Sequence, residues 1–217
     1  MSQYCEEMVK EALGKKLGMT QVFDETANLV ATTVIKVDPM CVLEKVSYPK
    51  GIKAKVGYFK ILSSKENKVK KPILGYFKKI GVSPYRVIKE VEIENESDLK
   101  LKEEIGVDIF KEGDIVDVRA KSKGKGFQGG MKRHNWHGQP RTHGSTTHRR
   151  IGSAGATTFP GRIIKGHRMP GHMGDSYTTI KNLKILKVDA QKGILYIKGA
   201  VPGAINSIVI IKKRKSA

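Results

Sequence analysis

The feature that most constrains this chain is a long stretch that contains no acidic residue. Between residues 121 and 174 there is neither Asp nor Glu, although the chain has 21 acidic residues in all. The stretch holds all six histidines and is rich in glycine. Its apolar residues follow neither a helical nor a strand period, so we predict irregular structure.

An irregular segment of this length is unusual inside a compact domain, where connections typically have on the order of 4–6 residues. A loop of about fifty residues is either disordered alone or ordered by a partner. Carboxylates would repel phosphate and none is present, while glycines let backbone N–H groups approach phosphates closely. We therefore predict that the segment threads into folded RNA.

A flexible basic linker is the alternative interpretation of this segment. Plain linkers rarely carry large apolar side chains among their charges, and this one contains Trp136, Phe127, Phe159, Met169 and Met173. Such residues indicate packing within the protein or stacking on bases, and the sequence leaves both open.

The net charge of +20 predicts a polyanionic partner. A membrane is not expected, because no apolar run approaches the roughly 20 residues that span a bilayer. We also expect no signal peptide, since Glu6, Glu7 and Glu11 interrupt the start of the chain. The two cysteines, Cys5 and Cys41, match no metal or redox spacing and indicate reduced thiols.

The flanks of the acid-free segment favour a mainly β fold with few short helices. Short strand patterns separated by turn signals predict a closed or nearly closed barrel, with the segment inserted between two of its strands. The alternation over 177–188 slips once, which predicts a bulge. A hairpin is expected over 186–199, with its turn at 190–193. The expected strands cover 29–37, 53–59, 87–93, 114–118, 177–188, 194–198 and 205–211, and the expected helices cover 71–80, where Pro72 marks the start, and, more weakly, 3–13.

The residues argue against an enzyme, a metal site and a cofactor. His134 and His137, like His143 and His148, have no Cys, Asp or Glu near them in sequence to complete a metal site. A Ser–His–Asp arrangement lacks a local carboxylate, and only a distant one could supply it. The glycine-rich stretch 124–130 has neither the spacing of a Walker A loop nor that of a dinucleotide fingerprint.

Several segments, taken together and in order, resemble one family, the bacterial ribosomal protein L3 family of the large subunit. Similarity begins near Leu13 and covers nearly all of the chain from there. The segments that carry it are GKKLGMT at 14–20, KSKGKGFQG at 121–129, THGS at 142–145, GRIIKGHRMPGHMG at 161–174 and KGAVPGA at 198–204.

The resemblance implies a translation-protein-type β-barrel with a long extension that runs toward the peptidyl transferase centre. It further implies a structural protein of the ribosome that binds near the 3′ end of the large rRNA and acts early in subunit assembly. The segment around Trp136 would lie at or near the finger that points to the catalytic RNA. A glutamine that is methylated in some members has Ala156 at its position here, so we expect no such modification.

The sequence therefore predicts an rRNA-binding, non-enzymatic protein of the cytoplasmic ribosome, with rRNA and neighbouring ribosomal proteins as partners. We expect an N-terminal extension at 1–12, a barrel body at 13–120 and 175–217, and a basic extension at 121–174. Arg149 and Arg150 are expected to bridge phosphates. The predicted RNA-binding residues are Lys121, Lys123, Lys125, Phe127, Lys132, Arg133, His134, Trp136, His137, Arg141, His143, His148, Arg149, Arg150, Arg162, Lys165, His167, Arg168 and His172.

Two other functions fit a basic chain less well. A DNA-architectural protein commonly shows a dimer motif or a minor-groove wedge, and the sequence has no helical recognition element. An RNA-modifying enzyme needs a cofactor loop or a catalytic acid in the basic segment, and neither is seen. Competition by DNA would favour the first alternative, and turnover of a nucleotide substrate would favour the second.

Overall fold

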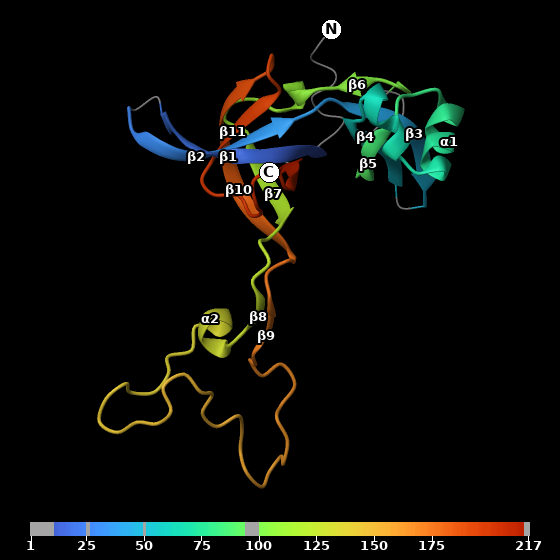
Figure 1. Cartoon of the computed structure of the whole chain (residues 1–217). Helices are drawn as coiled ribbons and strands as arrows, with labels where there is room; N and C mark the ends of the chain where they lie inside the picture. Colours follow the sequence, from blue (N-terminus) through green and yellow to red (C-terminus); the bar gives the residue numbers. More distant parts are fainter. Residues whose placement is uncertain (1–10, 25–26, 50, 94–99, 215–217) are drawn as a thin grey trace. The chain divides into compact units, whose positions relative to one another are not determined.

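The computed structural model describes residues 11–24, 27–49, 51–93 and 100–214 (Figure 1). The chain divides into two compact units. One contains the residues up to Lys121 and those from Tyr177 onward, and the other is Ser122–Ser176. We call the first unit the body and the second the extension, and each is described by itself.

The body contains a closed barrel of six strands. In order around the barrel these are β1 (Glu11–Phe23), β12 (Ile208–Lys213), β7 (Ile115–Lys121), β10 (Tyr177–Asp189), β11 (Ile194–Lys198) and β2 (Leu29–Val37). Every neighbouring pair is antiparallel. The predicted mainly β fold is confirmed, and closure of the barrel leaves this sheet without free edges.

Alternating side chains fill the barrel. In β7, Val116, Val118 and Ala120 are fully buried while their neighbours are exposed or half-buried. In β11, Leu195 and Ile197 are likewise fully buried between neighbours that are half-buried or exposed. Since successive side chains of a strand point to opposite faces, this two-residue period is what places the apolar set inside.

Two irregularities predicted from sequence appear in the barrel. The register between β10 and β7 shifts between Ile180 and Leu183, and Asn182 within the shift adopts a positive φ of 60°. This confirms the bulge. The hairpin of β10 and β11 turns through 190–193, as expected, and Gly193 passes so close to β2 that an added Cβ would lie 2.7 Å from the Val37 carbonyl oxygen.

Hydrogen bonds join the turn at 198–207 to β1 and β2, which lie far from it in sequence. The Lys16 ammonium donates a hydrogen bond of 2.6 Å to the Val201 carbonyl, and the Asn206 N–H donates one of 2.7 Å to the Lys16 carbonyl. On β2, the Thr33 hydroxyl donates to the Gly199 carbonyl at 2.6 Å. These hydrogen bonds hold the turn at 198–207 against β1 and β2 of the barrel.

A second sheet completes the body. Its four antiparallel strands run in the order β5 (Tyr85–Glu92), β4 (Gly51–Lys60), β3 (Met40–Tyr48) and β6 (Glu104–Ile105). The predicted helix is confirmed as α1 (Lys71–Ile80), with Pro72 in its first turn and Gly81 at φ 74° ending it. Its Phe77 is buried in one cluster with Cys41, Leu43 and Tyr85. Two 3₁₀ helices, η1 (Ser63–Lys68) and η2 (Val107–Ile109), lie in the connections.

The weaker helix prediction, over residues 3–13, is wrong for residues 11–13. Residues 11–13 begin β1, because Ala12 and Leu13 are buried in the barrel opposite Ile211 and Ile210. Residues 3–10 lie outside the described residues. The acid-free segment is largely irregular, as predicted, but it also forms three short elements that sequence reasoning missed: β8 (Gly126–Gln128), α2 (Gly130–His134) and β9 (Gly171–Met173).

Candidate nucleic-acid interface

The two ends of the extension run side by side. The Ser122 N–H donates to the Ser176 carbonyl at 2.9 Å, and the Lys125 N–H donates to the Met173 carbonyl at the same distance. Strand β8 then pairs with β9, placing Phe127 opposite His172. Within the extension, the segment therefore leaves and returns as a narrow ladder, visible in Figure 1 as the paired β8 and β9.

A glycine–tryptophan contact follows the ladder. Asn135 ends α2 in the left-handed conformation at φ 56°, which turns the chain back over the helix. Gly130 is buried, and a Cβ on it would lie 1.9 Å from the Trp136 ring. The half-buried indole thus packs directly on the glycine backbone. This contact places the indole beside α2, and the position of the segment relative to the catalytic RNA stays a prediction.

Two side chains of α2 hold the returning arm. The Arg133 guanidinium donates to the Met169 carbonyl at 2.6 Å, and His134 Nε2 lies 3.1 Å from the same oxygen. A Cβ on Gly171 would lie 2.6 Å from the Arg133 guanidinium. Sequence reasoning assigned Arg133 and His134 to RNA, and it missed Gly130, Gly171 and the Met169 carbonyl because these contacts depend on how the two arms fold together.

Beyond α2, the chain near Gln139 lies beside the chain near His148. The Gln139 N–H donates to the His148 carbonyl at 3.1 Å, and His148 Nδ1 lies 3.2 Å from the Pro140 carbonyl oxygen. Three segments, 136–139, 150–153 and 166–168, line a cavity of about 500 Å³. The structure brings Trp136, Arg150, His167 and Arg168 together there, whereas the other predicted residues, apart from Lys121, are distributed along the extension.

Most of the predicted RNA-binding side chains are exposed. Only Arg133, His134 and Trp136 are half-buried. Lys121 is the last residue of β7 and belongs to the body. Several apolar side chains of the extension are also open to solvent, notably Phe127 with 76% and Phe159 with 88% of the surface exposed. A surface of this kind offers cations and flat apolar groups, the two features that nucleic acids bind.

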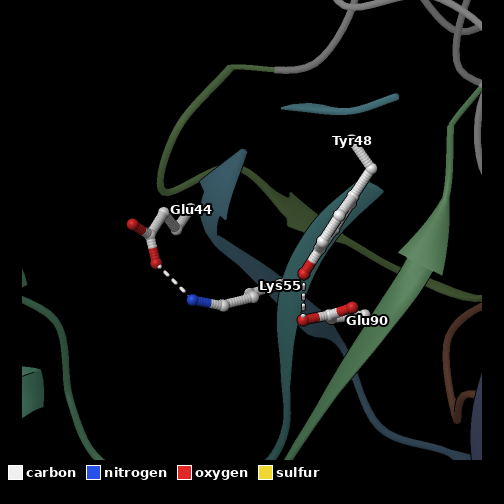
Figure 2. Close-up of polar contacts among 4 residues, drawn as sticks. All are labelled: Glu44, Tyr48, Lys55 and Glu90. Atoms are coloured by element: carbon white, nitrogen blue, oxygen red, sulfur yellow. Dashed lines mark hydrogen bonds and ion pairs between the residues drawn. The ribbon is translucent and has the colours of Figure 1, made fainter. Parts of the chain in front are cut away.

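The body, in contrast, pairs many of its cations with carboxylates. Figure 2 shows Lys55 of β4 donating to Glu44 of β3 at 2.9 Å, and the Tyr48 hydroxyl donating to Glu90 of β5 at 3.1 Å. The hydrogen bond from Lys55 lowers the pKa of Glu44, and the same bond raises the pKa of Lys55. Further ion pairs join Lys15 and Lys36 to Asp38, Lys60 to Glu104, Lys89 to Glu11, and Lys213 to Asp114.

Among the residues that the structure describes, no cluster of His, Cys, Asp or Glu is arranged to hold a metal ion. Nor does the described part of the chain include a helix long and apolar enough to cross a membrane. The extension presents hydrogen-bond donors, cations and aromatic rings, which are groups that bind phosphates and bases. A packed β body with a basic, glycine-rich extension of this kind defines a nucleic-acid-binding protein.

Comparison with known proteins gives the family. The family model described as ribosomal protein L3 matches residues 53–194. Large ribosomal subunit protein uL3 of Brachyspira hyodysenteriae (strain ATCC 49526 / WA1) is 46% identical over 208 residues, which cover 93% of this chain and 94% of that protein. The protein of the same name from Pelotomaculum thermopropionicum is 44% identical over 214 residues, 97% of this chain and 99% of that protein. The chain belongs to the ribosomal protein L3 family.

Membership of this family confirms the resemblance seen in the sequence motifs. It makes the protein a structural constituent of the large ribosomal subunit, and it also confirms that the chain is not an enzyme, because the family is one of structural proteins.

Proposed function

We propose that this protein is a primary rRNA-binding protein that binds near the 3′ end of the large rRNA. It nucleates assembly of the subunit and extends residues 121–174 toward the peptidyl transferase centre. In this proposal residues 13–120 and 175–217 form the anchoring body, and residues 1–12 have no assigned role. The partners are rRNA and neighbouring ribosomal proteins of the cytoplasmic ribosome, with no part for DNA or membrane.

The observation that carries the proposal is the exposed positive charge of residues 121–174, a stretch without acidic residues. No carboxylate occurs between residues 121 and 174, and nearly all of the cations there are exposed. Each Lys or Arg that neutralises a phosphate releases condensed counterions, so log K falls with log salt by about 0.7–0.9 per contact. Forked guanidinium groups such as those of Arg149 and Arg150 can bridge two backbone segments of compact RNA.

The test is binding to a fragment of the 3′ domain of the large-subunit rRNA over a series of salt concentrations. Ser122 and Ser176 are hydrogen-bonded neighbours, so a short Gly-Ser turn can join Lys121 to Tyr177 without disturbing the pairing of β7 with β10. We expect the intact chain to bind tightly and with a steep salt dependence, and the shortened chain to lose most of both. Equal binding by the two chains would move recognition to the body.

A matched pair of variants separates the extension from general charge. The double substitution Arg149→Gln and Arg150→Gln should reduce the salt slope by about 1–2. The control, Lys36→Gln with Lys55→Gln, removes the same charge from cations that already have carboxylate partners at 3.7 and 2.9 Å. DNA of equal length is added as a competitor, and competition as strong as that of rRNA would contradict the proposal.

A further inference from the structure

The extension contains a cavity of about 500 Å³ that is lined by residues from three of its segments. This volume falls within the range of roughly 300–1,000 Å³ of small-molecule pockets in proteins. The wall residues include one large ring, Trp136, two cations, Arg150 and Arg168, and two small residues, Gly152 and Ser153.

Hydrogen bonds hold the three segments of the wall in place. The hydrogen bonds of Arg133 and His134 to the Met169 carbonyl fix the chain that immediately follows His167 and Arg168. The bond from the Gln139 N–H to the His148 carbonyl brings the residues that precede Arg150 beside the residues that follow Trp136. The cavity is therefore a product of the fold of the extension.

The chemistry of the lining favours one class of ligand. The Trp136 indole packs on Gly130, and Trp136 is also one of the residues that line the cavity. Stacking of a nucleobase on such a ring does not depend on base identity, because every base has a π-face. Arg150 and Arg168 supply forked donors suited to phosphate oxygens, and no carboxylate lies between residues 121 and 174 to repel an anion.

We propose that this cavity receives one unstacked nucleotide of single-stranded RNA, with the base against Trp136 and the adjoining phosphates held by Arg150 and Arg168. The inference rests on the proposed function and deepens it, because it assigns a particular task to one part of the extension. Elsewhere the extension would contact the RNA backbone, and here it would hold a base outside the stack. Recognition of splayed-out bases is the usual mode by which proteins read single-stranded RNA.

Trp136 is the only tryptophan of the chain, so its fluorescence reports on the cavity directly. The experiment titrates the full chain with a short oligoadenylate, with an abasic oligomer of the same length, and with adenosine monophosphate. We expect the oligoadenylate to quench Trp136, the abasic oligomer to leave the emission nearly unchanged, and the mononucleotide to bind on the order of tenfold or more weakly, because it lacks the second phosphate contact. Equal quenching by the abasic oligomer would overturn the base-stacking proposal, and equal binding of the mononucleotide would overturn the assignment to an RNA strand.

A cavity-filling variant tests the site without changing its charge. Gly152 lines the cavity, has no positive φ, and has open space around the position of an added Cβ. Gly152→Leu should therefore abolish quenching by the oligoadenylate. Gly155→Leu is the matched control, since Gly155 lies close by in the chain, does not line the cavity and would meet no atom nearer than 4.0 Å. Similarly, Arg168→Gln should weaken quenching on the order of tenfold, and Arg162→Gln should not.

Binding of the 3′-domain rRNA fragment by each variant keeps this inference separate from the proposed function. If the parent chain fails to bind the fragment, the proposed function fails. If the parent binds but its Trp136 signal is indifferent to bases or to Gly152→Leu, the nucleotide site alone is overturned. Retained rRNA binding by Gly152→Leu, together with lost Trp136 quenching, is the expected result.

Discussion

Different interactions stabilise the fold of the body and the fold of the extension. The body buries a continuous apolar core, including Ile35, Val118 and Leu195, each with no exposed surface. In the extension, Gly130 alone is buried among its described residues, and the arms are joined by hydrogen bonds to carbonyls such as that of Met169. The body is stabilised by the removal of apolar surface from water, whereas the extension relies on a small number of polar contacts.

The difference extends to charge and has a functional meaning. In the body, Lys55 and Lys213 lie 2.9 and 2.8 Å from carboxylates. These carboxylates partly neutralise the positive charge of the two side chains. Cations between residues 121 and 174 have no carboxylate in their own segment. We therefore expect a polyanion to bind residues 121–174, a stretch with cations and no carboxylate, more strongly than it binds the ion-paired surface of the body.

The largest expected effect comes from the core of the body. Leu195→Ala should lower the free energy of unfolding by about 2–5 kcal/mol, because it removes buried methyl groups and leaves a cavity. The measurement is equilibrium unfolding in urea. The control is Ile164→Ala in the extension, where 71% of the residue surface is exposed and the change should stay within about 0.5 kcal/mol. Comparable losses in the two variants would show that the extension contributes to the same core.

The next effect is local to the extension. Gly130→Ala places a methyl group where the Trp136 ring lies, with a separation of 1.9 Å, so the indole must move at a cost of about 1–3 kcal/mol. We expect a red-shifted Trp136 emission and stronger quenching by acrylamide, while the unfolding transition of the body is unchanged. Gly129→Ala is the control, since a Cβ there meets nothing within 4 Å. An unaltered emission in Gly130→Ala would contradict the packing of Trp136 on this glycine.

The sequence predicted those parts of the fold that depend on local pattern. The strands Leu29–Val37 and Ile194–Lys198 and the helix Lys71–Ile80 agree with the predicted limits, because β-branched residues, alternation, an early proline and a terminal glycine are all local signals. Strands β1 and β3 were missed. In β1, Gly14 is required by a tertiary contact, since its Cβ would lie 2.5 Å from Ile35, and no local pattern reveals this.

The candidate interface divides in the same way. The absence of carboxylates could be read directly from residues 121–174 and identified the basic surface. The cavity and the clamp of Arg133 on Met169 could not, because residues 36 positions apart meet only when both arms are folded. Sequence reasoning therefore found the charge of the extension and missed how its arms are joined.

A smaller loss of stability is expected where β1 contacts the turn at 198–207. Lys16→Met removes the ammonium that donates to the Val201 carbonyl at 2.6 Å, and the half-buried site should lose about 1 kcal/mol of unfolding free energy. Amide exchange over residues 201–207 should accelerate. The control is Lys36→Met, which has an exposed ion pair at 3.7 Å and should change little. Unchanged exchange at 201–207 in Lys16→Met would show that the turn is held by its backbone contacts alone.

The smallest expected effect concerns the pair Glu44 and Lys55 on β3 and β4 of the second sheet, and it sharpens the comparison of charges (Figure 2). The hydrogen bond from Lys55 lowers the pKa of Glu44 below its ordinary value of 4.5. Because the folded pKa is depressed, the pair stabilises the body above that ordinary value, and this stabilisation is lost as pH falls through the lowered pKa. In Lys55→Met the pKa of Glu44, followed by NMR of its carboxyl carbon, should rise toward 4.5.

Lys53→Met is the matched control for this titration. Lys53 lies on the same strand, and its ammonium lies 5.3 Å from the centre of the Tyr48 ring, so its removal should leave the pKa of Glu44 nearly unchanged. Added salt should diminish the difference between the parent and Lys55→Met, because both partners are exposed to solvent. If Lys55→Met does not move the pKa of Glu44, the cations of the body are no better matched than those of the extension, and the contrast in charge must then rest on the distribution of carboxylates in the sequence alone.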